Sequence, residues 1–295
     1  MTSVWQTSRF CIDLAQPRVM GIVNVTPDSF SDGGVHGNTA DALRHCEQLI
    51  DAGADILDIG GESTRPGSQA VPLALELARI VPVLREAVKL GVPISIDTYK
   101  PEVMRAALDL GADIVNDVWA LRQPGGREVV AAHARCGVCL MHMHRDPRTM
   151  QLAPMDGDVV AQVRDFLAGS AQALLDMGVA AARIVLDPGI GFGKTAAQNF
   201  ALLAQQGELL KPGFGLLAGW SRKSSLGAAT GIEDASQRRV PSVAAALLAV
   251  ERGARIVRVH DVRDTVAALA VWRAMHEQAL QKTQHTFKTT TMGHS

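Results

Sequence analysis

Polar side chains recur where short apolar runs of the chain end. They are acids, amides and bases, namely Asn24, Asp58, Asp97, Asn116, Asp117, His142, Asp187, Arg258 and His260. Carboxylate and amide oxygens accept hydrogen bonds, so this set could bind a heterocycle that is rich in N–H donors. Polar residues also end strands and begin loops for purely structural reasons, so a structural role stays open for many of these residues.

Basic residues gather near the C-terminal end of the sequence. The run SRKS at 221–224 opens a predicted helix, where backbone amides and basic side chains suit an anion. Arg258 and His260 are two residues apart in a predicted strand, so their side chains leave the same face. Acidic groups beside an anion-binding cluster predict a ligand that joins a hydrogen-bond-rich or cationic heterocycle to a phosphate.

Two loops stand out by their composition. Segments 24–34 and 60–68 are rich in Gly, Pro, Ser and Asp, and each carries one large side chain, Phe30 or Arg65. Loops of this kind close over reacting ligands. Ordinary turn chemistry accounts for the small residues but not for the lone Phe or Arg.

Two motifs with familiar spacing do not predict a site. The segment DPGIGFGKT at 187–195 resembles a phosphate-binding loop, but Pro188 stands where that motif needs its first Gly. Cys136 and Cys139 have CxxC spacing, and His142 and His144 follow them. A structural zinc site would need a second cysteine pair, so buried thiols in a strand are the better interpretation.

The elements that must position these residues alternate between strand and helix. Eight apolar runs predict strands at 19–24, 56–60, 94–97, 114–117, 138–142, 184–187, 216–219 and 256–260. Helical periodicity or helix start and stop signals mark 41–52, 101–110, 159–177 and 240–252, and each of these four segments is followed by a Gly. The pattern favours a (β/α)8 barrel, with an open doubly wound sheet as the alternative. In a barrel the polar strand ends would meet at one mouth.

Length and composition fit one such domain. The chain has 295 residues, 47% hydrophobic and 20% charged, with a formal net charge of −1. That balance gives no reason to expect nucleic acid or an anionic membrane as a partner. Four cysteines are too few for a disulfide scaffold, and the polar N-terminus has no signal-peptide core, so we expect a cytoplasmic protein. A single barrel is expected over 1–277, followed by a disordered tail at 278–295.

Eight segments in order resemble the dihydropteroate synthase family, the pterin-binding enzymes of folate synthesis that sulfonamides target. They are MGIVNVTPDSFSD (20–32), DIGGESTRPG (58–67), SIDTYK (95–100), ND (116–117), MHM (141–143), LDPGIGFGK (186–194), SRKS (221–224) and RVHD (258–261). The resemblance covers nearly the whole chain, and each segment lies at or near a predicted strand end. The stretch after MHM and the Trp before SRKS depart from the family pattern.

The resemblance implies a reaction and a set of roles. A pterin-binding (β/α)8 barrel would condense 6-hydroxymethyl-7,8-dihydropterin diphosphate with p-aminobenzoate, with Mg2+, by dissociative substitution. The implied pterin-binding residues are Asp97, Asn116, Asp187 and Lys223. Those implied for the diphosphate are Thr64, Arg65, Arg258 and His260, with Asn24 as a metal ligand, and those for p-aminobenzoate are Phe30, Arg65 and Ser224. The implied catalytic groups are Asp97, Asp32, Phe30, Arg65 and Lys223.

Two other functions remain possible at the level of the sequence. A pterin-binding methyltransferase barrel would share the pterin-binding strand ends but lack the Arg65 loop motif and SRKS, which are both present. A non-catalytic pterin-binding paralogue predicts losses at Phe30, Arg65 or the basic cluster, and these residues are retained. The resemblance also implies a homodimer and small-molecule substrates as the partners.

Overall fold

Eight parallel strands close into a barrel in the computed structural model, which describes residues 2–26, 34–63, 69–146, 149–150 and 154–291, without the side chains of 34–38 and 279–291. The barrel strands are β3 (Arg18–Asn24), β4 (Ile56–Gly60), β5 (Ile94–Asp97), β6 (Ile114–Asp117), β7 (Gly137–Met141), β8 (Ile184–Asp187), β9 (Gly215–Ala218) and β10 (Ile256–Val259). The last strand, β10, pairs with the first, β3, which closes the ring. The (β/α)8 fold is confirmed over the open sheet, and every predicted strand lies within one residue of an observed one.

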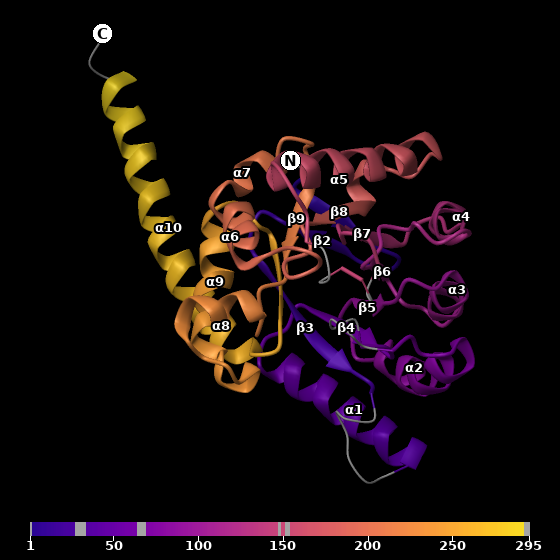
Figure 1. The fold of residues 1–295 in the computed structure, drawn as a ribbon. Helices are drawn as coiled ribbons and strands as arrows, with labels where there is room; N and C mark the ends of the chain where they lie inside the picture. Colours follow the sequence, from indigo (N-terminus) through magenta and orange to yellow (C-terminus); the bar gives the residue numbers. More distant parts are fainter. Residues whose placement is uncertain (1, 27–33, 64–68, 147–148, 151–153, 292–295) are drawn as a thin grey trace.

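Helices surround the barrel on its outer side (Figure 1). They are α1 (Gly34–Asp51), α2 (Leu73–Ala87), α3 (Pro101–Asp109), α4 (Gly126–Ala132), α5 (Val159–Asp176), α6 (Ala196–Ala204), α7 (Gln206–Leu209), α8 (Ser224–Thr230), α9 (Arg239–Glu251) and α10 (Val262–Thr291). Short 3-10 helices span Ala181–Arg183 and Ala235–Gln237. The predicted helix-terminating glycines Gly53, Gly111, Gly178 and Gly253 all have φ between 83° and 99°. That left-handed conformation ends a helix and costs Gly nothing.

The C-terminal helix α10 is longer than the sequence predicts. It continues to Thr291, so residues 278–291 are helical where a disordered tail was expected, and its distal half extends away from the barrel (Figure 1). The segment contains neither Gly nor Pro before Gly293, so no residue stops the helix at 277. Within the described residues, no helix is both long enough and apolar enough to cross a membrane.

The barrel interior changes character along its length. At the N-terminal ends of the strands the inward side chains form an apolar layer, made of Met20, Ile56, Ile114, Cys139, Val185, Leu217 and Ile256. A hairpin of β1 (Val4–Gln6) and β2 (Cys11–Asp13) closes this end, and its Trp5 is fully buried against the layer. The indole N–H of Trp5 donates to the carbonyl of Arg183 at 2.9 Å. Cys139 is thus a buried thiol in a strand, as predicted, and Cys136 is also buried.

Candidate active site

The polar strand-end residues are brought together at the C-terminal mouth of the barrel. Strand side chains alternate, so each residue two positions beyond the apolar layer also points inward. These second-layer residues include Asp58, Asn116, Asp187 and Arg258, which follow Ile56, Ile114, Val185 and Ile256 on their strands. Asp97 ends β5 in register with Asn116 of β6. The three carboxylates and the amide are all buried.

Arg258 bridges two of these carboxylates. Its Nε donates to Asp58 Oδ2 at 2.6 Å, and its Nη2 donates to Asp97 Oδ2 at 2.6 Å. The amide Nδ2 of Asn116 donates to the same Asp58 oxygen at 3.1 Å. The other carboxylate oxygens, Asp58 Oδ1 and Asp97 Oδ1, are buried and have no hydrogen-bond partner in the described part of the chain. Buried acceptors of this kind are suited to donors supplied by a ligand.

Burial shifts the pKa values of two carboxyl groups at the mouth of the barrel. Desolvation raises the pKa of Asp97 to about 7, against the opposing effect of the Arg258 charge. Desolvation also raises the pKa of Asp187 to about 6, although Asp187 accepts the Gly189 N–H at 2.7 Å. A donor-rich ligand would relieve the burial cost of both carboxylates, because hydrogen bonds to the ionised form favour it.

Lys223 follows β9 (Gly215–Ala218), the strand next to β8, which carries Asp187. Its Nζ sits 4.2 Å from the centroid of the Phe192 ring, a cation–π distance. A Cβ at Gly191 would lie 3.2 Å from Lys223 Cδ, and Gly191 has φ of +85°. Only glycine therefore fits beside this lysine without strain. Ser224 is exposed and begins α8, directly after Lys223.

The basic cluster is assembled only in part. Ser221 Oγ lies 2.9 Å from His260 Nδ1 and accepts the His260 backbone N–H at 3.1 Å. Together these two contacts fix the position and orientation of the His260 ring. Arg222, by contrast, forms a 2.8 Å ion pair with Asp261.

A buried lysine, Lys194, organises the loop after β8 in a role that the sequence does not predict. Lys194 Nζ lies 2.9 Å from His142 Nδ1 and donates to the carbonyls of Gly189 at 2.9 Å and Phe192 at 3.2 Å. Desolvation lowers the pKa of Lys194 to about 7, and desolvation together with the Lys194 charge lowers that of His142 to about 2. Lys194, the lysine of the segment that resembles a phosphate-binding loop, thus connects the C-terminal ends of β7 and β8 through buried contacts.

A second buried ionic group lies beside the ends of β4 and β5. The Lys100 ammonium contacts the carboxylates of Glu62 and Glu76. Thr98 Oγ1 donates to Glu76 at 2.8 Å, and Tyr99 OH donates to Glu62 at 2.8 Å. These contacts fix the chain at Glu62, and neither Glu62 nor Glu76 was among the predicted site residues.

Several predicted site residues lie outside the described residues, namely Phe30, Asp32, Thr64 and Arg65. Asn24, the predicted metal ligand, ends β3 and is half-buried. Among the residues that the structure describes, no three His, Cys, Asp or Glu side chains are grouped as a metal site would need. A single amide at the mouth suits a Mg2+ ion that takes its other ligands from water and substrate phosphates.

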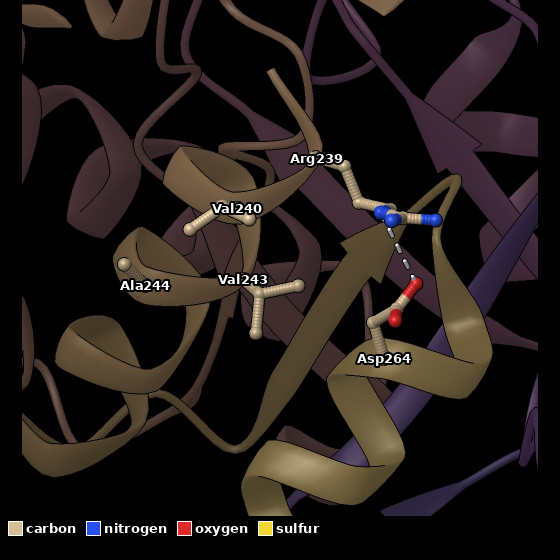
Figure 2. Close-up of a pocket in the computed structure, with 5 residues that line it drawn as sticks. All are labelled: Arg239, Val240, Val243, Ala244 and Asp264. Carbon is tan, nitrogen blue, oxygen red and sulfur yellow. Dashed lines mark ion pairs between the residues drawn. The ribbon is translucent and has the colours of Figure 1, made fainter. Parts of the chain in front are cut away.

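A groove on the outer surface is distinct from the mouth. It has a volume of about 380 Å³ and is lined by Arg239, Val240, Val243, Ala244 and Asp264 of α9 and α10. Figure 2 shows its Arg239–Asp264 ion pair, with a separation of 3.8 Å, beside the apolar side chains. The groove contains none of the strand-end residues.

Comparisons with known proteins agree on one family. The model of the pterin binding enzyme family matches residues 20–260. A dihydropteroate synthase of Neisseria meningitidis serogroup B is 52% identical over 277 residues, 92% of this chain and 97% of that protein. A Xanthomonas albilineans dihydropteroate synthase structure with 4-aminobenzoic acid has a TM-score of 0.88 and 50% identity, over 94% of this chain and 99% of the other. A Burkholderia cenocepacia dihydropteroate synthase complexed with 7,8-dihydropteroate has a TM-score of 0.87 and 52% identity, over 95% and 98%.

Proposed function

The chain belongs to the pterin-binding enzyme family, among the dihydropteroate synthases, and from this premise we propose how its barrel mouth carries out the reaction. The enzyme is a transferase that joins the pterin methylene of 6-hydroxymethyl-7,8-dihydropterin diphosphate to the amino nitrogen of p-aminobenzoate. The products are 7,8-dihydropteroate and diphosphate.

One observation carries the assignment of the pterin site. The floor of the mouth presents buried acceptors from three strands, those of Asp97, Asn116 and Asp187. The amino-pyrimidine edge of a pterin is rich in N–H donors, so it satisfies these acceptors in charge-assisted bonds. Lys223 supplies the complementary donor for the ring carbonyl and N5.

The basic side of the mouth binds the leaving group. Arg258 and His260 contact the diphosphate, joined by Thr64 and Arg65 from the second loop. Asn24 would hold Mg2+ through its amide oxygen, and the ion would supply positive charge that neutralises the diphosphate. The Ser221 contact supports the assignment of His260, because the 2.9 Å approach to Nδ1 orients the imidazole ring.

The chemistry is a dissociative substitution. The bond from the pterin methylene to the diphosphate oxygen breaks, and Asp97 stabilises the positive charge that spreads into the ring. The neutral amine of p-aminobenzoate then attacks the methylene and loses its proton. Phe30, Asp32 and Arg65 on the loops assemble the p-aminobenzoate pocket and exclude water, while Ser224 binds its carboxylate. No covalent enzyme nucleophile is required.

The assembly is a homodimer, and the compartment is the cytoplasm. Four exposed apolar side chains support a partner surface on the two adjacent helices α9 and α10, namely Val240, Leu248, Val271 and Met275. Val240 and Val271 are 74% and 72% exposed, so a second copy that covers this surface would remove apolar area from water. Light scattering at micromolar concentration tests the dimer, and a monomer would contradict it.

The reaction is tested by release of diphosphate from purified protein supplied with both substrates and Mg2+. We expect release that depends on p-aminobenzoate, and formation of dihydropteroate in equal amount. A pterin-binding methyltransferase or a non-catalytic binder would give neither. Asp97→Ala should abolish turnover while the protein remains folded, and near-normal turnover would remove Asp97 from the mechanism.

A further inference from the structure

Asp58 occupies a central place in the mouth that the reaction scheme above does not use. It is fully buried on β4, and its Oδ2 receives both the Arg258 Nε at 2.6 Å and the Asn116 Nδ2 at 3.1 Å. In the barrel order β10-β3-β4-β5-β6, β4 lies two strands from β10 and two strands from β6. One carboxylate therefore connects two ligand-facing residues from opposite sides.

This contact decides what Asn116 offers to a ligand. A side-chain amide has a donor end and an acceptor end, and a carboxylate oxygen accepts. Because Asp58 takes the NH2 end, the carbonyl Oδ1 of Asn116 is the end available to the ring. Asp97 and Asp187 also accept, so the floor becomes uniformly an acceptor surface. With the amide reversed, the floor would mix a donor with acceptors.

The same carboxylate orients Arg258. The guanidinium is planar, and its Nε and Nη2 are directed at Asp58 and Asp97 respectively. Two anchors on one planar group fix its rotation as well as its position. Asp58 thus contributes one of the two contacts that align Arg258 with the acidic floor.

We propose that Asp58 is a specificity-determining positioning residue, which fixes the Asn116 amide as an acceptor and so selects rings that carry an amino donor. The proposal rests on the proposed pterin function and deepens it. The ligands it distinguishes are 2-amino pterins and the 2-oxo analogues in which a carbonyl replaces the amino group. The 2-oxo ring places its carbonyl oxygen, an acceptor, against the acceptor oxygens of the floor. These buried polar groups are then left without hydrogen bonds.

The test compares binding of 6-hydroxymethylpterin and its 2-oxo analogue by calorimetry. Asp58→Ala removes the oxygen that accepts from both Arg258 Nε and Asn116 Nδ2, so the Asn116 amide can reverse and present its NH2 end to the ring. We expect the 2-amino ring to bind about 10- to 100-fold more weakly, the scale of one charge-assisted hydrogen bond. The preference over the 2-oxo ring should fall by a similar factor.

The matched control is Ser95→Ala. Ser95 faces Asp58 in the β4–β5 register and is fully buried, and its hydroxyl has no hydrogen-bond partner in the described part of the chain. The control should leave the affinity for both rings unchanged. Wild-type affinity and preference in Asp58→Ala would overturn the proposal. Equal weakening of both rings would also overturn it, because a merely structural residue would act that way.

A second variant keeps the proposal testable if Asp58→Ala does not fold. Asn116→Asp places a second carboxylate at the 3.1 Å contact, where the pair must share a proton. Affinity for the 2-amino ring should then fall more steeply with rising pH than in the wild type, and an unchanged pH dependence would refute the contact. Wild-type turnover is measured separately, so failure of the synthase reaction is distinguishable from failure of the role of Asp58.

Discussion

The Arg258–Asp97 contact predicts a shift in the pH profile of the enzyme. In the proposed reaction Asp97 must be ionised to accept ligand N–H groups and to stabilise positive charge, and its pKa is raised to about 7 by burial. Arg258 opposes that rise through a bond of 2.6 Å. Arg258→Gln removes the charge, so the pKa of Asp97 should rise further and a larger part of the enzyme should be inactive at neutral pH.

The size of the shift follows from the geometry. Two unit charges about 4 Å apart interact by about 4 kcal/mol at an effective dielectric constant of about 20. At about 1.36 kcal/mol per pKa unit this is about 3 units, and water entering the vacated space reduces it. We therefore expect the acidic limb of kcat/KM for the pterin substrate to move from near pH 7 upward by about 1 to 3 units.

The assay is a kcat/KM profile between about pH 6 and 10 for wild type and Arg258→Gln. If turnover of the variant is too slow, the pH dependence of pterin-ring binding reports the same pKa. Arg9→Gln is the control, because Arg9 also forms a 2.6 Å ion pair with a buried carboxylate, Asp113, at the other end of the barrel. Its profile should keep the wild-type limb. An acidic limb that stays in place in Arg258→Gln would refute this account of Asp97.

Three further predictions concern the scaffold. Trp5→Ala should lower the free energy of unfolding by about 3–5 kcal/mol in urea titrations, while the folded fraction keeps its activity. A loss below about 1 kcal/mol would show that the hairpin does not brace the barrel. Lys194 has its pKa lowered to about 7 in the folded protein against about 10.4 when unfolded, so the unfolded chain binds more protons between these values. The contribution of Lys194 to the free energy of unfolding should therefore rise with pH across that window and be absent in Lys194→Met. Parallel plots of unfolding free energy against pH for the two proteins would contradict this. Gly189→Ala places a Cβ 1.9 Å from the His142 carbonyl oxygen at a φ of +66°, whereas Gly91→Ala at +80° meets nothing within 4 Å. Gly189→Ala should lower the free energy of unfolding by clearly more than the about 1–2 kcal/mol of backbone strain expected for Gly91→Ala. Equal melting temperatures of the two variants would count against the clash.

The strands and the mouth could be predicted because their signals are local. An apolar run such as 114–117 ends in Asn116 and Asp117, and repetition of that pattern indicates parallel strands whose ends meet. The helix-ending glycines are equally local, because a left-handed residue is required at a fixed place. The fold class and the gathering of polar strand-end residues at one mouth therefore followed from the order of the residues.

The contacts between distant segments could not be predicted in this way. Asp58 was visible as a strand-end acid, but its partner Arg258 is 200 residues away, and only strand order brings them together. Lys194 drew attention as part of a failed phosphate-loop motif, while its carbonyl contacts depend on the backbone path after β8. The C-terminal segment was judged by its polar composition, which does not reveal that α10 continues to Thr291.

The two-layer interior has a consequence for engineering this protein. The lower layer is largely apolar, and the upper layer buries charged groups such as Asp58, Asp97 and Asp187, whose desolvation opposes folding. A selection for heat resistance alone would therefore find some of its gains by making the upper layer apolar, and each such gain would erase ligand recognition. Thermostable and active variants should instead be sought in the lower layer, the hairpin and the surface.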